Sequence, residues 1–407
     1  MKILHTADWH LGQRFLFQER AEEHQMALNW LLETIQKEQI DVLLVAGDIF
    51  DINNPPNYAR SQYYTFLTQL MSTACRHVVI TGGNHDSPSM LHAPRPLLQA
   101  LNIQVIGAVS ENRQEDLLLL KDKQGDLELV VAAVPFLRYR DLDVSVAGEG
   151  GHERVARIQA GLVRHYQQMS EYATEYENAG VPIIATGHLY ATGALASDKQ
   201  DNIYIGNIEN IKAEHFPKNF HYIALGHIHR PQIVGGIDHI RYSGSLIPLS
   251  FTETQDTKSV YILKTDGAEI KTVEPIELPV FRRLKTIAGS LQKVKEDLRR
   301  FANKEREGLR PWVEVIVETE QVIPQLDQEL KQFAADMELE ILKVKLKRNY
   351  QPLDVQYLDA PDLSELDTLE VFKRKCESYG SAPEEMEGLI QSFRELQDWM
   401  KEKAEES

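Results

Sequence analysis

Five short polar motifs in this chain carry side chains that could do chemistry, and each one follows a strand-like run. Their Asp, Asn and His side chains are oxygen and imidazole ligands of divalent metal ions, and none of the motifs offers a thiolate. The motifs are Asp8-Trp9-His10, Gly47-Asp48-Ile49-Phe50-Asp51, Gly83-Asn84-His85-Asp86, Gly187-His188 and Gly226-His227-Ile228-His229. Because this set is too large for a single ion, the sequence predicts two ions bridged by one carboxylate, about 3.5–4 Å apart. Such a pair activates water and offsets charge on a phosphoryl group, which is the chemistry of phosphoester hydrolysis.

The motifs differ in how much each one indicates by itself. A lone Gly-Asp after a strand is ordinarily a turn, and Asn84-His85-Asp86 could equally cap a helix that begins near Ser87-Pro88. Gly-His-x-His is more specific, because alternation along an extended segment puts His227 and His229 on one face. The mixture of oxygen and imidazole donors favours Mn²⁺, Fe²⁺ or Zn²⁺ over Mg²⁺. Glycines before the ligands permit a sharp strand-to-loop turn and a close approach to ions and phosphate.

The runs that precede the motifs must position them. Runs such as 41–46, 77–80 and 181–185 are short and rich in Val and Ile, which is typical of buried strands. Amphipathic stretches at 19–39 and 57–75 alternate with the first of them, so we expect an α/β domain. In open α/β sheets ligands collect at the carboxyl ends of the strands. The five motifs are therefore expected to converge at one edge, although they are far apart in the chain.

The rest of the chain divides into further regions. Apolar runs at 222–226, 232–234, 239–243 and 259–264 lie closer together and predict a hairpin-rich second sheet packed on the first. Residues 279–350 predict a small α+β module, with strands at 279–287, 312–319 and 339–347 and helices at 290–305 and 323–336. A linker follows, and then helices at 364–378 and 383–405. The apolar stripe of the last helix either packs on its own domain or docks on another protein's helices.

Charge is distributed unevenly along the chain. The net charge of −17 argues against a simple polyanion binder, whereas residues 279–350 hold 15 basic and 12 acidic residues, a net of +3. Candidate DNA contacts in this module are Arg282, Arg283, Lys343, Lys345 and Lys347. The three lysines alternate and share one face of a strand. That face is either simply solvated or contacts DNA phosphates without reading sequence.

Other features limit the cellular context. No apolar run reaches the roughly 18 residues of a membrane span, the N-terminus does not look like a secretory signal, and the chain has 2 cysteines far apart. We therefore expect a cytoplasmic protein without a disulfide framework. The sequence has no Gly-x-x-x-x-Gly-Lys-Ser/Thr loop, so any use of ATP is expected to come through a partner.

The motifs, taken in this order, resemble those of the calcineurin-like metallophosphoesterase superfamily. Asp8-Trp9-His10-Leu11-Gly12, Gly47-Asp48-Ile49-Phe50-Asp51 and the segment from Asp198 to Gly206 look like the SbcD family, bacterial relatives of the Mre-type recombination nucleases. The resemblance implies a four-layer α-β-β-α sandwich with a small α+β capping domain and C-terminal helices. The implied domains are a nuclease domain at 1–277, a DNA-capping domain at 278–350, a linker at 351–363 and a helical docking region at 364–407.

The same resemblance implies a role for each motif residue. Asp8, His10 and His229 would hold one ion, and Asn84, His188 and His227 the other, with Asp48 bridging them. His85 would not bind metal; it would hydrogen-bond the phosphate or protonate the leaving oxygen. Asp51 would orient His85. Mn²⁺ is the expected metal, with Mg²⁺ and Fe²⁺ as alternatives.

The implied function is that of a nuclease subunit in DNA repair, recombination and replication. It would act as an ATP-dependent exonuclease and endonuclease on double-stranded DNA, including hairpins and blocked ends. The implied assembly is a homodimer within a heterotetramer, docked on the coiled coil of an SbcC-type, SMC-like ATPase and associated with the nucleoid. Two alternatives remain: a phosphodiesterase or phosphatase acting on small nucleotides or phosphoproteins with the same metal site, and a metal-stabilised scaffold for the ATPase.

Overall fold

The computed structural model describes residues 1–142, 150–192, 210–303, 307–319 and 323–348, together with 369, 372 and 388–393. The chain separates into two compact units, Met1–Arg348 and Asn349–Ser407, and every element described below belongs to the first. The expected linker, most of the two expected terminal helices and the motif from Asp198 to Gly206 lie outside the described residues. Among the residues described, no helix combines the length and apolar character needed to cross a bilayer.

The first sheet has six strands in the order β16-β15-β1-β4-β5-β6. They are β1 (Lys2–Thr6), β4 (Val42–Ala46), β5 (His77–Thr81), β6 (Ile103–Ile106), β15 (Ser259–Asp266) and β16 (Glu269–Glu277). Strands β1, β4, β5 and β6 run parallel, while β15 and β16 form an antiparallel hairpin that joins the edge of β1. Strands β4 and β5 are buried along their whole length because both faces of the sheet are covered.

The second sheet also has six strands, in the order β13-β14-β12-β9-β8-β7. They are β7 (Leu117–Lys121), β8 (Leu127–Ala132), β9 (Ile183–His188), β12 (Tyr222–Gly226), β13 (Gln232–Val234) and β14 (Ile237–Tyr242). The four central strands are parallel, and β7 and β13 close the two edges in antiparallel hairpins. The expected second sheet is confirmed for the runs at 222–226, 232–234 and 239–243. The run at 259–264 was wrongly assigned to it, because this run forms β15, which pairs with β1 in the first sheet.

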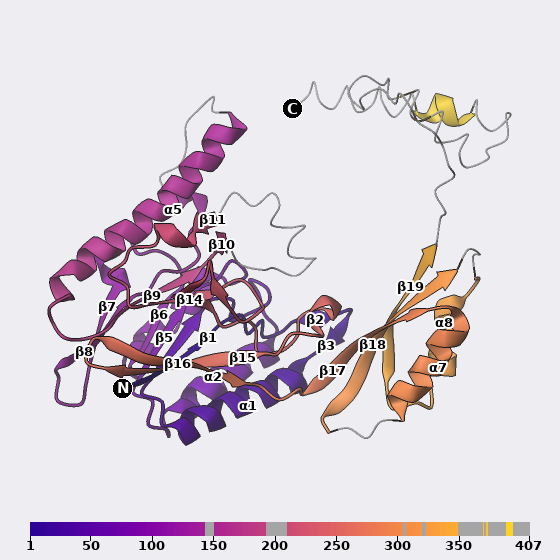
Figure 1. The fold of residues 1–407 in the computed structure, drawn as a ribbon, viewed down its shortest axis with the longest axis horizontal. Coiled ribbons are helices and arrows are strands. Elements are labelled where there is room, and N and C mark those ends of the chain that lie inside the picture. The colour runs from indigo at the N-terminus through magenta and orange to yellow at the C-terminus, as the bar shows by residue number, and fades with distance from the viewer. Residues whose placement is uncertain are drawn as a thin grey trace. The chain divides into compact units, whose positions relative to one another are not determined.

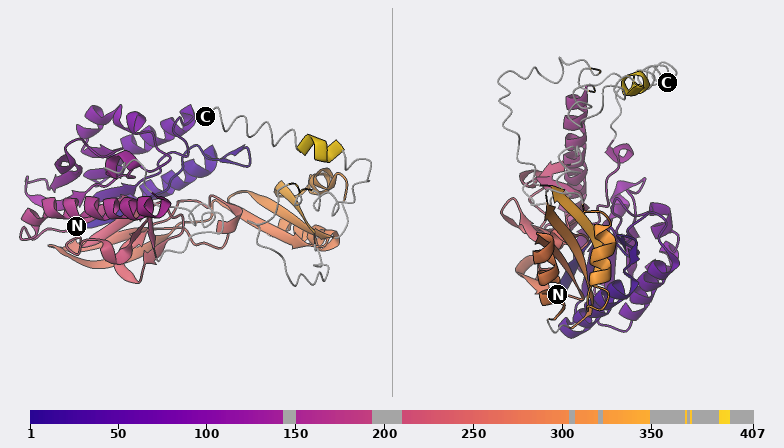
Figure 2. Two further views of the ribbon diagram at one scale, coloured as in Figure 1. Left: turned by 90° about the horizontal axis from the view of Figure 1, so that it is seen from above. Right: turned by 90° about the vertical axis from the view of Figure 1, so that its right-hand side faces the viewer.

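Helices cover the outer face of each sheet, so the domain has four layers (Figures 1 and 2). Helices α1 (Ala21–Glu38) and α2 (Asn57–Leu70) pack on the first sheet, and α5 (Gly151–Ala173) packs on the second. Between the sheets lies a third apolar layer, which includes Ile3, Val42, Leu129 and Tyr222. Alternate residues of β1 and β4 face this layer and the α1–α2 layer, as the period of two in a strand requires. This is the α-β-β-α order that the family resemblance implies.

Short elements connect these layers near the strand ends. They are β2 (Arg14–Phe15), β3 (Gln18–Glu19), α3 (Pro88–His92), α4 (Arg95–Gln99), β10 (Tyr190–Thr192), β11 (Asn210–Lys212) and the 3-10 turns η1 (Arg113–Asp116), η2 (Tyr139–Leu142), η3 (Thr174–Tyr176), η4 (Ala213–His215) and η5 (Phe251–Glu253). Helix α2 ends at Leu70, short of the expected residue 75. The hydroxyls of Ser72 and Thr73 bond main-chain carbonyls at Gln69 and Leu70, which competes with a further helical turn.

Residues 282–348 form a three-stranded sheet with its own apolar core. The elements are β17 (Arg282–Gly289), α7 (Leu291–Ala302), β18 (Leu309–Thr319), α8 (Leu326–Phe333) and β19 (Glu340–Arg348). All three strands are parallel, and the two crossover helices pack through Val294, Leu298 and Leu330 against β18 (Figure 1). The predicted order of strand, helix, strand, helix, strand is confirmed. Both helices are shorter than predicted; α7 begins after Ser290, whose hydroxyl accepts from the Lys293 N–H at 3.4 Å.

Candidate metal centre

All five polar motifs lie where a strand ends, at the carboxyl ends of β1, β4, β5, β9 and β12. Three of these strands belong to the first sheet and two to the second, and main-chain groups join the ends across the layer between them. Nδ1 of His188, at the end of β9, lies 2.9 Å from the Ala46 carbonyl at the end of β4. The N–H of His227, after β12, donates to the Asp8 carboxylate at 2.9 and 3.0 Å. Two packed sheets therefore bring the motifs to one place.

The first cluster consists of Asp8, His10 and His229. Their candidate ligand atoms all lie within 4.8 Å of one another. Asp8 and His10 are buried, and His229 is partly buried, with its ring centroid 5.0 Å from that of His10. Nε2 of His10 is buried without a hydrogen-bond partner among the described residues. An orphaned imidazole nitrogen beside a carboxylate and a second imidazole fits a divalent ion.

The second cluster consists of Asp48, His188 and His227, with Asn84 beside it. The side-chain oxygen of Asn84 lies 3.1 Å from Nε2 of His188 and 2.9 Å from Nδ1 of His227. One carboxylate oxygen of Asp48 lies 3.2 Å from Nε2 of His188 and 3.5 Å from Nε2 of His10. Asp48 thus stands between the two clusters, where a bridging carboxylate belongs. The donor set of imidazole nitrogens with carboxylate and amide oxygens fits two divalent ions.

The backbone at these candidate ligands is unusual. Asp8, His10, Asp48 and His227 all have positive φ, at 52°, 46°, 50° and 99°. Left-handed backbone at residues other than glycine costs on the order of 1–3 kcal/mol each and is found where function over-determines the conformation. Gly226 is required for a different reason, because a Cβ there would lie 1.9 Å from the Ala46 carbonyl oxygen. The close approach of the strand ends depends on that glycine.

Electrostatics in the metal-free cluster couple its acids to its imidazoles. Burial opposes ionisation of Asp48, but the charges of His188 and His10 outweigh it and hold its pKa well below the usual range. Burial likewise opposes protonation of His10 and His188. The carboxylates of Asp51 and Asp48 outweigh it at His10, and Asp48 outweighs it at His188, so the pKa of each imidazole is raised to about 9. A cation bound at these imidazoles would compete with their protons.

His85 stands beside both clusters and is exposed. Its main-chain N–H donates to Oδ1 of Asp48 at 2.9 Å, and its ring meets the His10 ring edge-on, with the two ring centroids 4.9 Å apart. Nδ1 of His85 lies 2.6 Å from the main-chain carbonyl of Asp51. A carbonyl only accepts, so Nδ1 carries a proton and Nε2 is left for another partner. An exposed imidazole held in this way next to the clusters can reach a bound phosphate.

Asp51 contacts His85 differently from what the sequence suggests. The contact is made by its main-chain oxygen, whereas its carboxylate oxygen lies 3.1 Å from Nδ1 of His10. The reason is the path of the chain: residues 48–51 run beside residues 8–11, with Leu11 N bonded to the Ile49 carbonyl and Asp51 N to the Leu11 carbonyl. This pairing aims the Asp51 side chain at His10, and a carboxylate on the outer nitrogen of an imidazole orients it for a metal.

Comparison with known proteins identifies the family. A model described as calcineurin-like phosphoesterase matches residues 1–231, and one described as Type 5 capsule protein repressor C-terminal domain (SbcD_C) matches residues 280–379. The SbcD subunit of the SbcCD nuclease of Escherichia coli (strain K12) is 38% identical over 378 residues, which is 92% of each chain. The chain belongs to the SbcD family. The corresponding SbcCD nuclease subunits of Rhodobacter capsulatus and Bacillus subtilis are 36% and 34% identical, covering 69% and 68% of this chain and 70% of each relative.

The role of Asp86, which is part of a polar motif, was not indicated by the sequence, and Glu253 was not found from the sequence at all. The Asp86 carboxylate accepts N–H groups from Gly83 at 2.8 Å, Phe50 at 3.0 Å and Ile49 at 3.1 Å, so it ties two ligand loops together instead of capping a helix. Its burial and then the nearby Asp48 raise its pKa to about 6. Glu253 is buried, with Oε1 3.5 Å from Nδ1 of His229. Its place in a loop 24 residues after His229 left no motif by which to find it.

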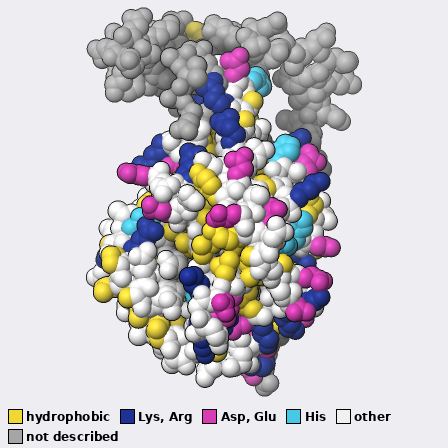
Figure 3. Space-filling view, turned by 90° about the vertical axis from the view of Figure 1, so that its left-hand side faces the viewer, with side chains coloured by type: hydrophobic (Ala, Val, Ile, Leu, Met, Phe, Trp, Pro, Cys, Tyr) yellow, Lys and Arg dark blue, Asp and Glu magenta, His cyan; other side chains and the backbone are white. Residues whose placement is uncertain are grey.

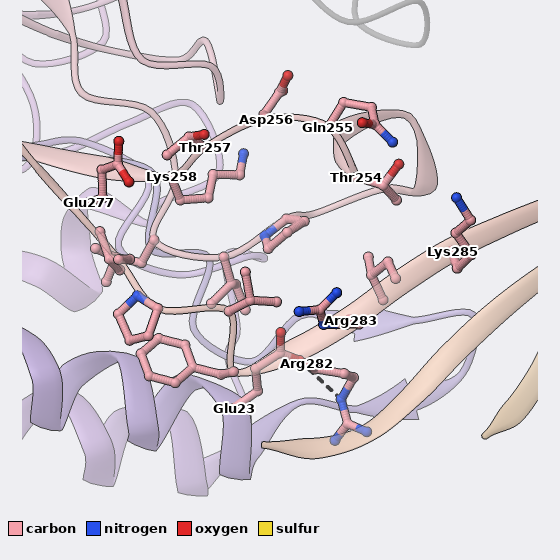
Figure 4. A pocket seen from close by; sticks show the side chains of 18 of the residues that line it. Glu23, Thr254, Gln255, Asp256, Thr257, Lys258, Glu277, Arg282, Arg283 and Lys285 are labelled. Atoms are coloured by element: carbon pink, nitrogen blue, oxygen red, sulfur yellow. Dashed lines mark hydrogen bonds and ion pairs between the residues drawn. The ribbon is translucent and has the colours of Figure 1, made fainter. Parts of the chain in front are cut away.

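The cations proposed to contact DNA have different surroundings in the SbcD_C region. Arg282 lies 3.3 Å from Glu23, and its guanidinium is 4.0 Å from the centre of the Trp312 ring, so this side chain joins the sheet of residues 282–348 to α1. Lys343 and Lys345 lie 3.8 and 2.8 Å from Glu314, and Lys347 lies 3.2 Å from Glu318. Arg283 and Lys285 are exposed. They line a cavity of about 560 Å³ between the 254–258 loop and residues 277–285 (Figure 4).

Proposed function

We propose that the chain hydrolyses phosphodiesters of double-stranded DNA with two divalent ions. The observation that carries this proposal is the pair of clusters that meet at Asp48, with the exposed imidazole of His85 beside them. Asp8, His10 and His229 would hold one ion, and Asn84, His188 and His227 the other. Membership of a family whose named members are nuclease subunits supports DNA as the substrate. Mn²⁺ is the proposed metal, with Mg²⁺ and Fe²⁺ as the alternatives.

The residues of the chain divide the work of the reaction. Bound divalent ions supply the Lewis acidity that activates water and offsets charge on the phosphoryl oxygens. Asp48 fixes the spacing of the two clusters, and its Oδ1 accepts the His85 N–H, which sets the position of that residue. His85 keeps Nδ1 on the Asp51 carbonyl and turns its other nitrogen to the substrate, where it binds the phosphate or protonates the leaving O3′. Asp51 acts on His10 through its carboxylate and on His85 through its backbone.

DNA contacts beyond the metals would come from local cations. On the face drawn in Figure 3, basic and acidic side chains are interspersed, in keeping with the net charge of −17. Arg283 and Lys285 alternate on β17 and are exposed, which makes them the best candidates for phosphate contacts. Lys343, Lys345 and Lys347 share their charge with Glu314 and Glu318, so their contribution would be smaller. Arg282 would act by holding the sheet in place.

The assembly proposed is that of the SbcCD nucleases. Residues 1–277 would form the nuclease domain and residues 278–350 the DNA-capping domain. After a linker at 351–363, residues 364–407 would dock on the coiled coil of an SbcC-type ATPase, with two copies of each protein. ATP would act only through that partner, in the cytoplasm and on the nucleoid. The substrates would be duplex ends, hairpins and blocked ends, cut by exonuclease and endonuclease activity.

The test is cleavage of linear and hairpin duplex DNA by the full chain with Mn²⁺, alone and with its ATPase partner and ATP. A His85→Leu variant is assayed in parallel, and Mn²⁺ binding to both proteins is measured by calorimetry. We expect the wild type to cleave DNA and the His85→Leu variant not to cleave it. Both the wild type and the variant are expected to bind two ions. Absence of DNA cleavage under every condition, with a chromogenic phosphodiester still hydrolysed, would instead make the chain a phosphodiesterase of small substrates. A His85→Leu variant that binds fewer ions would move His85 into the ligand set.

A further inference from the structure

A buried acid–base pair lies directly behind His229. Glu253 and Lys258 are 2% and 5% exposed, and Nζ of Lys258 donates to Oε2 of Glu253 at 2.7 Å. The same ammonium group donates to the His229 carbonyl at 2.8 Å and to the Ser245 hydroxyl at 3.0 Å. Burying two charges is costly unless each is paired and hydrogen-bonded. Here all three protons of the ammonium group have acceptors, so the pair is held in one geometry.

The carboxylate of Glu253 is itself fixed on both oxygens. Oε2 accepts the Leu249 N–H at 3.0 Å as well as the Lys258 ammonium. Oε1 accepts the Ser250 hydroxyl at 3.2 Å and faces Nδ1 of His229 at 3.5 Å. The acid therefore presents one oxygen to the imidazole and uses the other to hold its own position.

A similar arrangement is found at two other imidazoles of the site, those of His10 and His188, whereas His227 turns its Nδ1 to the side-chain oxygen of Asn84 at 2.9 Å. Nδ1 of His10 lies 3.1 Å from the Asp51 carboxylate, and Nδ1 of His188 lies 2.9 Å from the Ala46 carbonyl. In each case an oxygen engages the outer nitrogen and leaves Nε2 facing the cluster. An imidazole that binds metal through one nitrogen is oriented by a hydrogen bond from the other, and loss of that bond weakens metal binding by about 10–100-fold.

We infer that Glu253 is a positioning residue that fixes His229 with Nε2 toward the metal, and that Lys258 holds Glu253 in place for this task. The inference rests on the proposed two-metal site. It explains why a lysine and a glutamate are buried together in a loop that has no part in either ligand cluster. An acid that served stability alone would not need its second oxygen beside a ligand imidazole.

The turn that carries Glu253 is also held from the opposite side. Phe251, in the same turn η5, packs with Phe15, Leu284 and Trp312, of which the last two belong to β17 and β18. On the other flank, residues 254–258 line the cavity of Figure 4, where Lys258 is seen beside Glu277. The sheet of residues 282–348 therefore braces the turn that orients His229.

The test is a Mn²⁺ titration of the full-length chain by calorimetry. Glu253→Gln keeps the size of the side chain and removes its charge, and we expect one of the two ions to bind about 10–100-fold more weakly while the other is unchanged. Because this variant leaves Lys258 buried without its partner, the double variant Glu253→Gln/Lys258→Met removes both charges. It is expected to keep the fold, measured by circular dichroism, and to show the same weakened ion.

Glu128→Gln is the matched control. Glu128 is also a nearly buried acid beside an imidazole, 3.1 Å from Nε2 of His77, but it lies at the opposite ends of the strands from the metal ligands. This variant is expected to bind both ions as the wild type does. A double variant that is folded and binds both ions with wild-type affinity would overturn the inference. Failure of the wild type to bind two ions would instead overturn the proposed site, and the inference with it.

Discussion

Replacing Asp86 with asparagine tests how the two ligand loops are held together. The carboxylate receives three main-chain N–H groups, two on Oδ2 from Gly83 and Ile49 and one on Oδ1 from Phe50, and it is fully buried. Asparagine has nearly the same shape but only one acceptor oxygen. In either orientation its NH₂ group faces at least one N–H donor that has lost its acceptor.

The magnitude follows from those three contacts. In the better orientation the amide oxygen takes the Oδ2 position and keeps Gly83 and Ile49, while the Phe50 N–H is left unsatisfied. A buried donor without an acceptor costs about 1–3 kcal/mol. Removal of the charge offsets part of this cost, because burial and the nearby Asp48, which raise the pKa of Asp86 to about 6, make the ionised carboxylate unfavourable in the fold at pH 8. We expect a net loss of about 1–2 kcal/mol in the free energy of unfolding. Because the loops carry Asp48 and Asn84, we also expect weaker Mn²⁺ binding.

The assay is urea unfolding of the metal-free chain in chelator at pH 8, above the pKa of about 6 that Asp86 has in the fold. Asp122→Asn is the control: Oδ1 of that carboxylate accepts both main-chain N–H groups, from Gln124 at 2.9 Å and Asp126 at 3.0 Å, and these bonds are exposed. The asparagine oxygen can keep both bonds and water reaches the site, so the free energy of unfolding should change by no more than about 0.5 kcal/mol. Equal effects of the two substitutions would refute the reasoning, since a buried N–H without an acceptor would then not decide the outcome.

Three further predictions concern charge. His10 and His188, with pKa values raised to about 9, add stability to the metal-free chain that is complete below pH 6.5 and is lost as the pH rises through 9. In the presence of chelator, the chain should therefore unfold at a lower urea concentration at pH 9.5 than at pH 6.5. Binding of Mn²⁺ at pH 7.5 should release about two protons, which calorimetry in buffers of different ionisation enthalpy measures. Replacing Arg283 and Lys285 with Glu should make the negative slope of log affinity for duplex DNA against log salt shallower by at least about 1.8. Lys271→Glu is the control, because Lys271 is an exposed lysine of β16 that pairs with Glu269. An unchanged slope would exclude these two cations as phosphate contacts.

Much of the architecture followed from local patterns. The run at 41–46 became β4 and the run at 77–80 became β5, because Val- and Ile-rich segments of this length form strands that are buried on both faces. The carboxyl-edge rule then placed the polar motifs together before any distance was known. Element ends were less well predicted, since hydroxyl contacts such as those of Ser72 and Thr73 are invisible in a hydrophobic pattern.

The sequence by itself determined which residues are candidate metal ligands, where they lie along the strands and which family the chain belongs to, because these depend on residues close together in the chain. The tertiary structure alone decided what each polar group contacts. Arg282 has a DNA-competent side chain, yet it meets Glu23, which is 259 positions away. The Asp51 carboxylate faces His10 and not His85 because two loops run side by side. Glu253 was found only when packing brought a distant turn behind His229, since a buried charge takes its partner from space and not from sequence.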